Sequence, residues 1–173
     1  MPTALEAILG RGIFTKVDLQ VRGTDKTIPK AHYKFYYRSV LSGKDEPLLL
    51  DVLFEANPYT CLEALPICTS FVKCDENETR VQIPSINCIL GDKLTAFAPC
   101  TTGIPYGVDK ELEIIKQLFD VAGLFDRMNQ VETVRENYER IVRQELAYRR
   151  QDYNVGQVLL DTFEASLTLS LRG

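Results

Sequence analysis

One lysine stands where a helix should bury its apolar side chains. Residues 86–97 have helical spacing, and at about 100° per residue Lys93 falls inside their apolar stripe. The stripe is formed by Ile89, Leu90, Leu94 and Phe97. Burying an unpaired ammonium group is costly, so Lys93 either reaches an anion such as a phosphate or extends its charged end to water. The position therefore indicates a candidate phosphate-binding lysine, with a lysine that only covers apolar surface as the alternative.

Two aspartates are further candidates, and each has a structural alternative. Asp51 lies in an apolar run, on the same face of an expected strand as Leu49 and Leu53. A carboxylate there can be a metal ligand or a general base, or it can point to solvent from the end of the strand. Asp120 falls on the polar side of an expected helix, where it can line a cleft, be solvated, or form an i,i+4 pair with Lys116.

A basic and aromatic row is expected on one strand face, formed by His32, Lys34, Tyr36 and Arg38. Such a row can contact a nucleic-acid backbone, with Tyr36 stacking on a base, but it is also typical of a solvated sheet face. The sequence has no Walker loop and no GxGxxG, GxSxG or HExxH motif, which removes support for the corresponding enzyme classes. Five cysteines without CxxC spacing and a single histidine favour reduced structural thiols over a zinc site.

Short strands should hold Asp51 and the basic row. Alternation from Tyr33 to Arg38 predicts a half-buried strand, and Pro47–Phe54 predicts a second, more apolar strand that pairs with the first across the turn at Ser42–Asp45. Two further short antiparallel strands are expected at Ile67–Val72 and Thr79–Ile83. A short helix is expected within Leu5–Phe14, ending near Gly10 or Gly12.

The second half of the chain should be helical and should hold Lys93 and Asp120. Apolar residues at helical spacing predict helices at Ile86–Phe97, Lys110–Phe125, Val131–Arg150 and Val155–Leu171. The expected fold class is α+β. A small mixed or antiparallel sheet lies in a lobe over residues 1–85, and a helical lobe follows over residues 86–173.

The composition is that of an ordinary globular protein. Of 173 residues, 45% are hydrophobic and 25% charged, and 20 Lys+Arg against 24 Asp+Glu give a formal net charge of −4. This balance argues against a protein that coats nucleic acid through charge alone. No run of about eighteen apolar residues and no secretory signal pattern is present, so we expect a cytoplasmic protein without a membrane partner.

Three segments, in this order, resemble the nucleotidyltransferase family of the AbiEii/AbiGii abortive-infection toxins, which belong to toxin–antitoxin systems. They are Leu50–Val52, Leu90–Ala96 and Lys116–Val121, with the sequences LDV, LGDKLTA and KQLFDV. The family has an acidic strand residue, a helix with a D-K-hydrophobic-x-A pattern and a helix of the K-D-hydrophobic-x-D type. The match covers about residues 47–126, and the order and spacing of its pieces carry it.

The resemblance implies a role for each candidate. Lys93 would contact the phosphates of a nucleoside triphosphate, Asp120 would be the acidic residue of the second helix, and Asp51 would be a carboxylate of the Mg²⁺ site. The implied reaction is transfer of a nucleotide to an RNA, including tRNA, or to a protein. The implied fold is a mixed-sheet nucleotidyltransferase lobe followed by a helical lobe.

The chain departs from the family at one motif. Members open with a glycine-rich G-G/S start and an R-x-S-x-D-hydrophobic-D strand, whose two aspartates hold the catalytic Mg²⁺; here Val17–Gln20 lacks the second aspartate. One carboxylate with a lysine is a poor Mg²⁺ site. We therefore expect an inactive or very weak enzyme, as a fragment of a longer product or a remnant. The alternative is a non-enzymatic module that binds an antitoxin or another protein. Absence of the first segment would leave a sheet edge or an apolar patch exposed, so we also expect self-association or partner binding.

Overall fold

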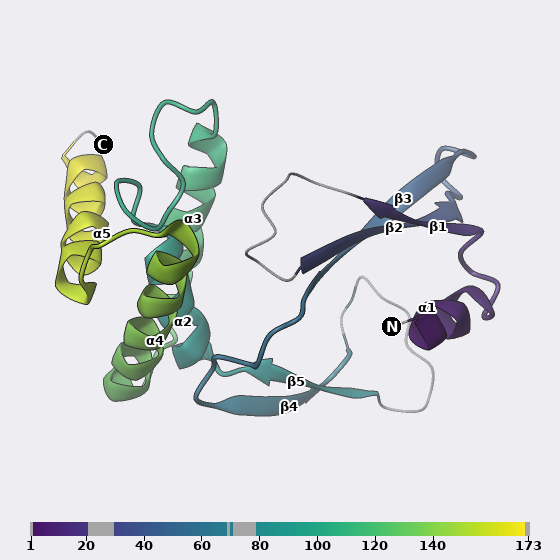
Figure 1. The fold of residues 1–173 in the computed structure, drawn as a ribbon, viewed down its shortest axis with the longest axis horizontal. Coiled ribbons are helices and arrows are strands. Elements are labelled where there is room, and N and C mark those ends of the chain that lie inside the picture. The colour runs from purple at the N-terminus through teal and green to yellow at the C-terminus, as the bar shows by residue number, and fades with distance from the viewer. Residues whose placement is uncertain (1, 21–29, 69, 71–78, 172–173) are drawn as a thin grey trace. The chain divides into compact units, whose positions relative to one another are not determined.

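The chain forms two compact units, Met1–Ala56 and Asn57–Gly173, and each is described by itself. The computed structural model describes residues 2–20, 30–68, 70 and 79–171 (Figure 1). Helices and small antiparallel sheets both occur, which confirms the α+β class. Within the described ranges, no helix has the length and apolar character needed to span a membrane.

The first unit contains helix α1 (Pro2–Leu9) and a three-stranded antiparallel sheet with the strand order β1-β2-β3. The strands are β1 (Lys16–Gln20), β2 (Lys30–Arg38) and β3 (Asp45–Leu53). Alternation along β2 buries Tyr33 and Phe35, and the Phe35 ring lies 5.2 Å from that of Phe14 between centroids. The β2–β3 register places His32 opposite Asp51. The hairpin predicted from the alternation is thus confirmed.

The second unit begins with a two-stranded hairpin and continues as helices. Strands β4 (Leu62–Pro66) and β5 (Arg80–Pro84) pair antiparallel. The helices are α2 (Ile86–Ala96), α3 (Glu111–Phe125), α4 (Val131–Arg149) and α5 (Val155–Ser170). Helix α2 starts directly after β5 because the Ser85 hydroxyl accepts a hydrogen bond from the Cys88 backbone N–H as an N-cap.

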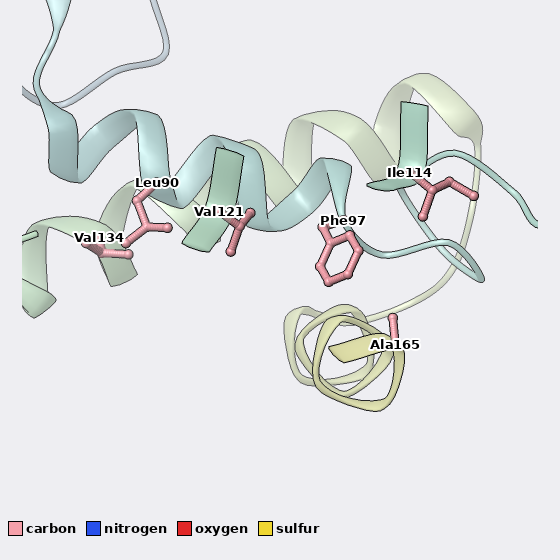
Figure 2. Close-up of a cluster of buried hydrophobic side chains, with 6 residues drawn as sticks. All are labelled: Leu90, Phe97, Ile114, Val121, Val134 and Ala165. Carbon is pink, nitrogen blue, oxygen red and sulfur yellow. The ribbon is translucent and has the colours of Figure 1, made fainter. Parts of the chain in front are cut away.

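Helix α2 is the centre of this unit. It packs against α4, α3 and α5, whereas α3 packs mainly against α2. Figure 2 shows the buried cluster that joins them: Leu90, Phe97, Ile114, Val121, Val134 and Ala165. Apolar residues at helical spacing therefore decide which helix faces meet, and these faces in turn position the polar residues beside them.

The four long helices end within one residue of their predicted bounds, but the first half needs corrections. The expected short helix is present and ends at Leu9, next to Gly10, in agreement with its expected end near Gly10 or Gly12, but it begins at Pro2 rather than Leu5. The expected strand at Ile67–Val72 is also wrong in its bounds. The strand paired with β5 is Leu62–Pro66, and residues 69, 71 and 72 lie outside the described residues. Strand β1 was not predicted.

The hairpin of β4 and β5 belongs to the same compact unit as the helices. The units divide between Ala56 and Asn57, whereas the sequence suggested a division after residue 85. The reason is visible at Ser85, which caps α2 while its backbone N–H donates to the Cys61 carbonyl. This hairpin is thereby tied to the start of the central helix.

Candidate functional site

Lys93 and Asp120 meet between α2 and α3. The Lys93 ammonium lies 2.9 Å from Asp120 Oδ2 and donates a second hydrogen bond to Gln117 Oε1 at 3.1 Å. The side chains of Lys93 and Asp120 are 32% and 30% exposed. Of the three candidate residues, the structure brings these two together into a partly buried ion pair.

Packing of the two helices explains this pairing. Leu90 and Phe97 flank Lys93 on α2 and are buried in the shared cluster, and on α3 the buried Val121 follows Asp120 directly. Gln117 and Asp120 are three residues apart, so both face the same side of α3. The charge of Lys93, which lies within an apolar stripe, is thus balanced by a carboxylate on the neighbouring helix. Asp120 pairs with Lys93 rather than with Lys116, which is exposed on α3.

The lysine keeps capacity for one more partner. An ammonium group has three donors, and within the described part of the chain two of them are directed at Gln117 Oε1 and Asp120 Oδ2. Because the pair is about one-third exposed, a phosphate oxygen can approach the third donor from solvent. Chemically, the arrangement can bind an anion next to a positioned carboxylate.

Asp51 lies in the other unit, on β3. Its Oδ1 is 2.6 Å from Nδ1 of His32 on the neighbouring strand, and its side chain is 66% exposed. The structure therefore gives Asp51 a cross-strand partner in its own unit and does not assign it to the Lys93–Asp120 pair.

Members of the basic row on β2 also contact side chains on the neighbouring strands. Arg38 lies 3.4 Å from Asp45, and Lys16 of β1 stands over the Tyr36 ring at 5.3 Å from its centroid. Lys16 itself pairs with Asp18 at 2.7 Å, and this contact raises its pKa. Cross-strand carboxylates thus accompany two members of the row, His32 and Arg38.

The residues that the structure describes do not fit a Mg²⁺ site. Across the described residues, no group of three or more His, Cys, Asp or Glu side chains is placed to hold a metal ion. At Asp120 the neighbouring charge is the Lys93 ammonium, which occupies one carboxylate oxygen. A Mg²⁺ ion requires several oxygen ligands in near-octahedral geometry, and one such carboxylate does not supply them.

Sequence reasoning missed two polar contacts on α2 and α3. Gln117 accepts from Lys93, and the signal for it was its position one helical turn before Asp120. The Tyr59 hydroxyl donates to Asp92 Oδ2 at 2.7 Å; burial, followed by this hydrogen bond, raises the pKa of Tyr59 well above its usual range. No spacing rule connects Tyr59 to Asp92, because 33 residues separate them.

The described cysteines are reduced, as the sequence indicated. Cys61, Cys68, Cys88 and Cys100 are free thiols, and Cys74 lies outside the described residues.

Comparisons with known protein families, with curated proteins and with solved structures find no match to this chain.

Proposed function

We propose that the Lys93–Asp120 site binds the phosphates of a nucleoside triphosphate, as part of a nucleotidyltransferase-type site that acts on an RNA or a protein. The observation that carries this proposal is the ion pair between α2 and α3, which leaves one donor of a partly exposed lysine for an anion. The resemblance of residues 47–126 to the AbiEii/AbiGii toxins supports it, because two of the three candidate residues named by that resemblance form the pair.

Each residue of the site has a distinct role in binding. Lys93 is a point charge that donates to a phosphate oxygen. Asp120 and Gln117 fix the direction of its side chain. The described carboxylates do not form a metal site, so this chain supplies nucleotide binding and orientation. We do not expect it to transfer a nucleotide by itself.

Nucleotide binding can be measured by fluorescence titration with a labelled ATP and competition by unlabelled ATP, GTP, CTP and UTP. Lys93→Met removes a charged hydrogen-bond donor and should weaken binding by about tenfold or more. Lys116→Met is the matched control, because it removes the same charge from the exposed face of α3. Equal binding by wild type and Lys93→Met, or an equal loss in the Lys116 variant, would contradict the proposal.

Transfer is tested separately with labelled nucleoside triphosphates, Mg²⁺ and total RNA or protein extract as acceptor. The chain alone should give no labelling above background. Robust labelling that disappears in Lys93→Met would show that the chain is active, and would refute the expected inactivity while retaining the site.

A second candidate function is protein binding by the helical unit. Helix α3 exposes Leu112, Ile115 and Phe119 at helical spacing, with 80%, 55% and 78% of their surface accessible. Such an apolar stripe is typical of a helix that docks on another protein, and the resemblance names an antitoxin as that partner. Light scattering at rising concentration tests whether a second copy binds instead. Phe119→Ser should reduce any association, and a strictly monomeric mass in both proteins would argue against self-association.

A further inference from the structure

We propose that a cavity between α5 and the loop after α2 binds a small organic cation, an ammonium or guanidinium group on a short apolar body. The cavity has a volume of about 380 Å³, within the usual range of small-molecule sites. Cys100 and Tyr106 of the loop line one side, and Asp161, Glu164, Ala165 and Leu169 of α5 line the other. This site does not depend on the function proposed for Lys93.

Asp161 is the buried carboxylate in the cavity lining. It is only 7% exposed, and its Oδ2 accepts hydrogen bonds from the Cys100 backbone N–H at 2.9 Å and from the Thr101 hydroxyl at 2.7 Å. These neutral donors hold the carboxylate in place but do not neutralise it. Within the described residues, neither Asp161 nor Glu164 forms an ion pair. A carboxylate so deeply buried normally has a cationic partner, and a cationic ligand in the cavity would supply one.

The pKa of the Cys100 thiol reflects the negative charges in this cavity. Its pKa is raised above the ordinary value, first by burial and then by the charges of Asp161 and Glu164. The described lining includes no lysine or arginine. A cation would therefore be attracted, and Cys100 remains a protonated thiol at neutral pH rather than a nucleophile.

The remaining lining selects among cations. Tyr106, Ala165 and Leu169 present an aromatic ring and aliphatic carbon, which suit the apolar body of an organic amine. A bare divalent metal is a poor fit, because no group of three or more ligating side chains converges there among the described residues. The competing explanation is that Asp161 only anchors the loop through Cys100 and Thr101.

The test is an NMR titration of the full chain with benzylammonium chloride, with benzyl alcohol as the neutral probe of equal size. We expect saturable shifts of the Cys100 and Thr101 amide signals with the amine and much weaker shifts with the alcohol. Equal responses to both probes, or no response to either, would overturn the proposal and leave Asp161 as a loop anchor only.

Variants separate the charge from the loop contact. Asp161→Asn keeps an oxygen that can accept from Cys100 and Thr101 but removes the charge, and it should abolish saturable amine binding. Glu164→Gln should weaken binding by about threefold to tenfold, as expected for a partly exposed charge pair. Glu136→Gln, on an exposed position of α4, is the matched control and should bind as wild type does. Should Asp161→Asn fail to fold, Glu164→Gln decides: unchanged affinity there, or equal weakening in the control, refutes the site.

Discussion

Gly91 of α2 lies directly against the backbone of Val134 in α4. A Cβ atom at Gly91 would stand 2.7 Å from the Val134 carbonyl oxygen and 2.9 Å from the Tyr138 backbone nitrogen. Only a hydrogen atom fits in this space, so the two helices touch at backbone level. The contact fixes α2 against α4 and thereby positions Lys93, which follows two residues later.

Gly91→Ala should lower the free energy of unfolding by about 1–3 kcal/mol, because the added methyl group must push two helix backbones apart. Gly123→Ala in α3 is the control, since a Cβ there meets nothing within 4 Å. It should raise stability by up to about 1 kcal/mol through helix propensity. Urea denaturation measures both, and two changes of the same sign would contradict the backbone contact.

Lys93→Met should change the free energy of unfolding by less than about 1 kcal/mol. The ion pair with Asp120 is about one-third exposed, and pairs at such positions contribute little net stability. An uncharged chain of similar length also suits the apolar stripe between Leu90 and Phe97. Urea denaturation of wild type, Lys93→Met, Asp120→Leu and the double variant gives the coupling energy. A loss above about 3 kcal/mol would mark the pair as a structural element of the core.

Asp120→Asn should strengthen the binding of ATP in the presence of EDTA. The substitution keeps an oxygen that can accept from Lys93 but removes the negative charge that repels the phosphates. The gain should shrink as salt is added, because exposed charges are screened. Asp126→Asn, at the exposed end of α3, serves as the control for net charge. Weaker binding in Asp120→Asn would mean that the carboxylate itself takes part in holding the nucleotide.

Stability should fall in alkaline solution because of Tyr59. Burial and the hydrogen bond to Asp92 raise the pKa of Tyr59 in the folded protein, so the unfolded chain ionises first. The contribution of protonated Tyr59 to stability is fully present below the pKa of tyrosine in the unfolded chain, about 10, and is lost as the pH rises beyond that pKa. Tyr59→Phe should cost about 1–2 kcal/mol at neutral pH and should reduce this alkaline loss. An identical pH dependence in Tyr59→Phe would contradict the assignment.

Cys100 should react slowly with iodoacetamide near neutral pH and faster in Glu164→Gln. Burial and the charges of Asp161 and Glu164 raise the pKa of the thiol, so removing one charge should move the reactivity midpoint to lower pH. Mass spectrometry of the Cys100 peptide follows this thiol separately from Cys61 and Cys68, which are exposed as Cys100 is. If the pH midpoint of Cys100 reactivity is the same in Glu164→Gln, the charge of Glu164 does not influence the cavity.

The elements that local spacing defines could be predicted from the sequence. The bounds of α2 to α5 follow from apolar residues at helical intervals, and the conflict at Lys93 was visible in the same pattern. Strand β1 was missed although its residues KVDLQ alternate between polar and apolar, because five residues are a short signal and their partners, residues 32–36, lie farther along the chain. The partner of Lys93 depends on which faces of α2 and α3 meet, which is a property of packing. Asp161 gave no signal either, since its importance arises only where the loop at Cys100 folds against α5.

The packing of α3 mainly against α2 has a consequence for how this unit opens. Local opening of α3 has to separate few groups, chiefly Ile114, Val121 and the Lys93–Asp120 pair, whereas α2 is enclosed by three helices. Amide protons of α3 should therefore exchange with solvent sooner than those of α2 and α4. A ligand that draws the Lys93 ammonium away from Asp120 also weakens the closure of α3. Occupancy of the site and the lifetime of the docked helix are then coupled through one equilibrium.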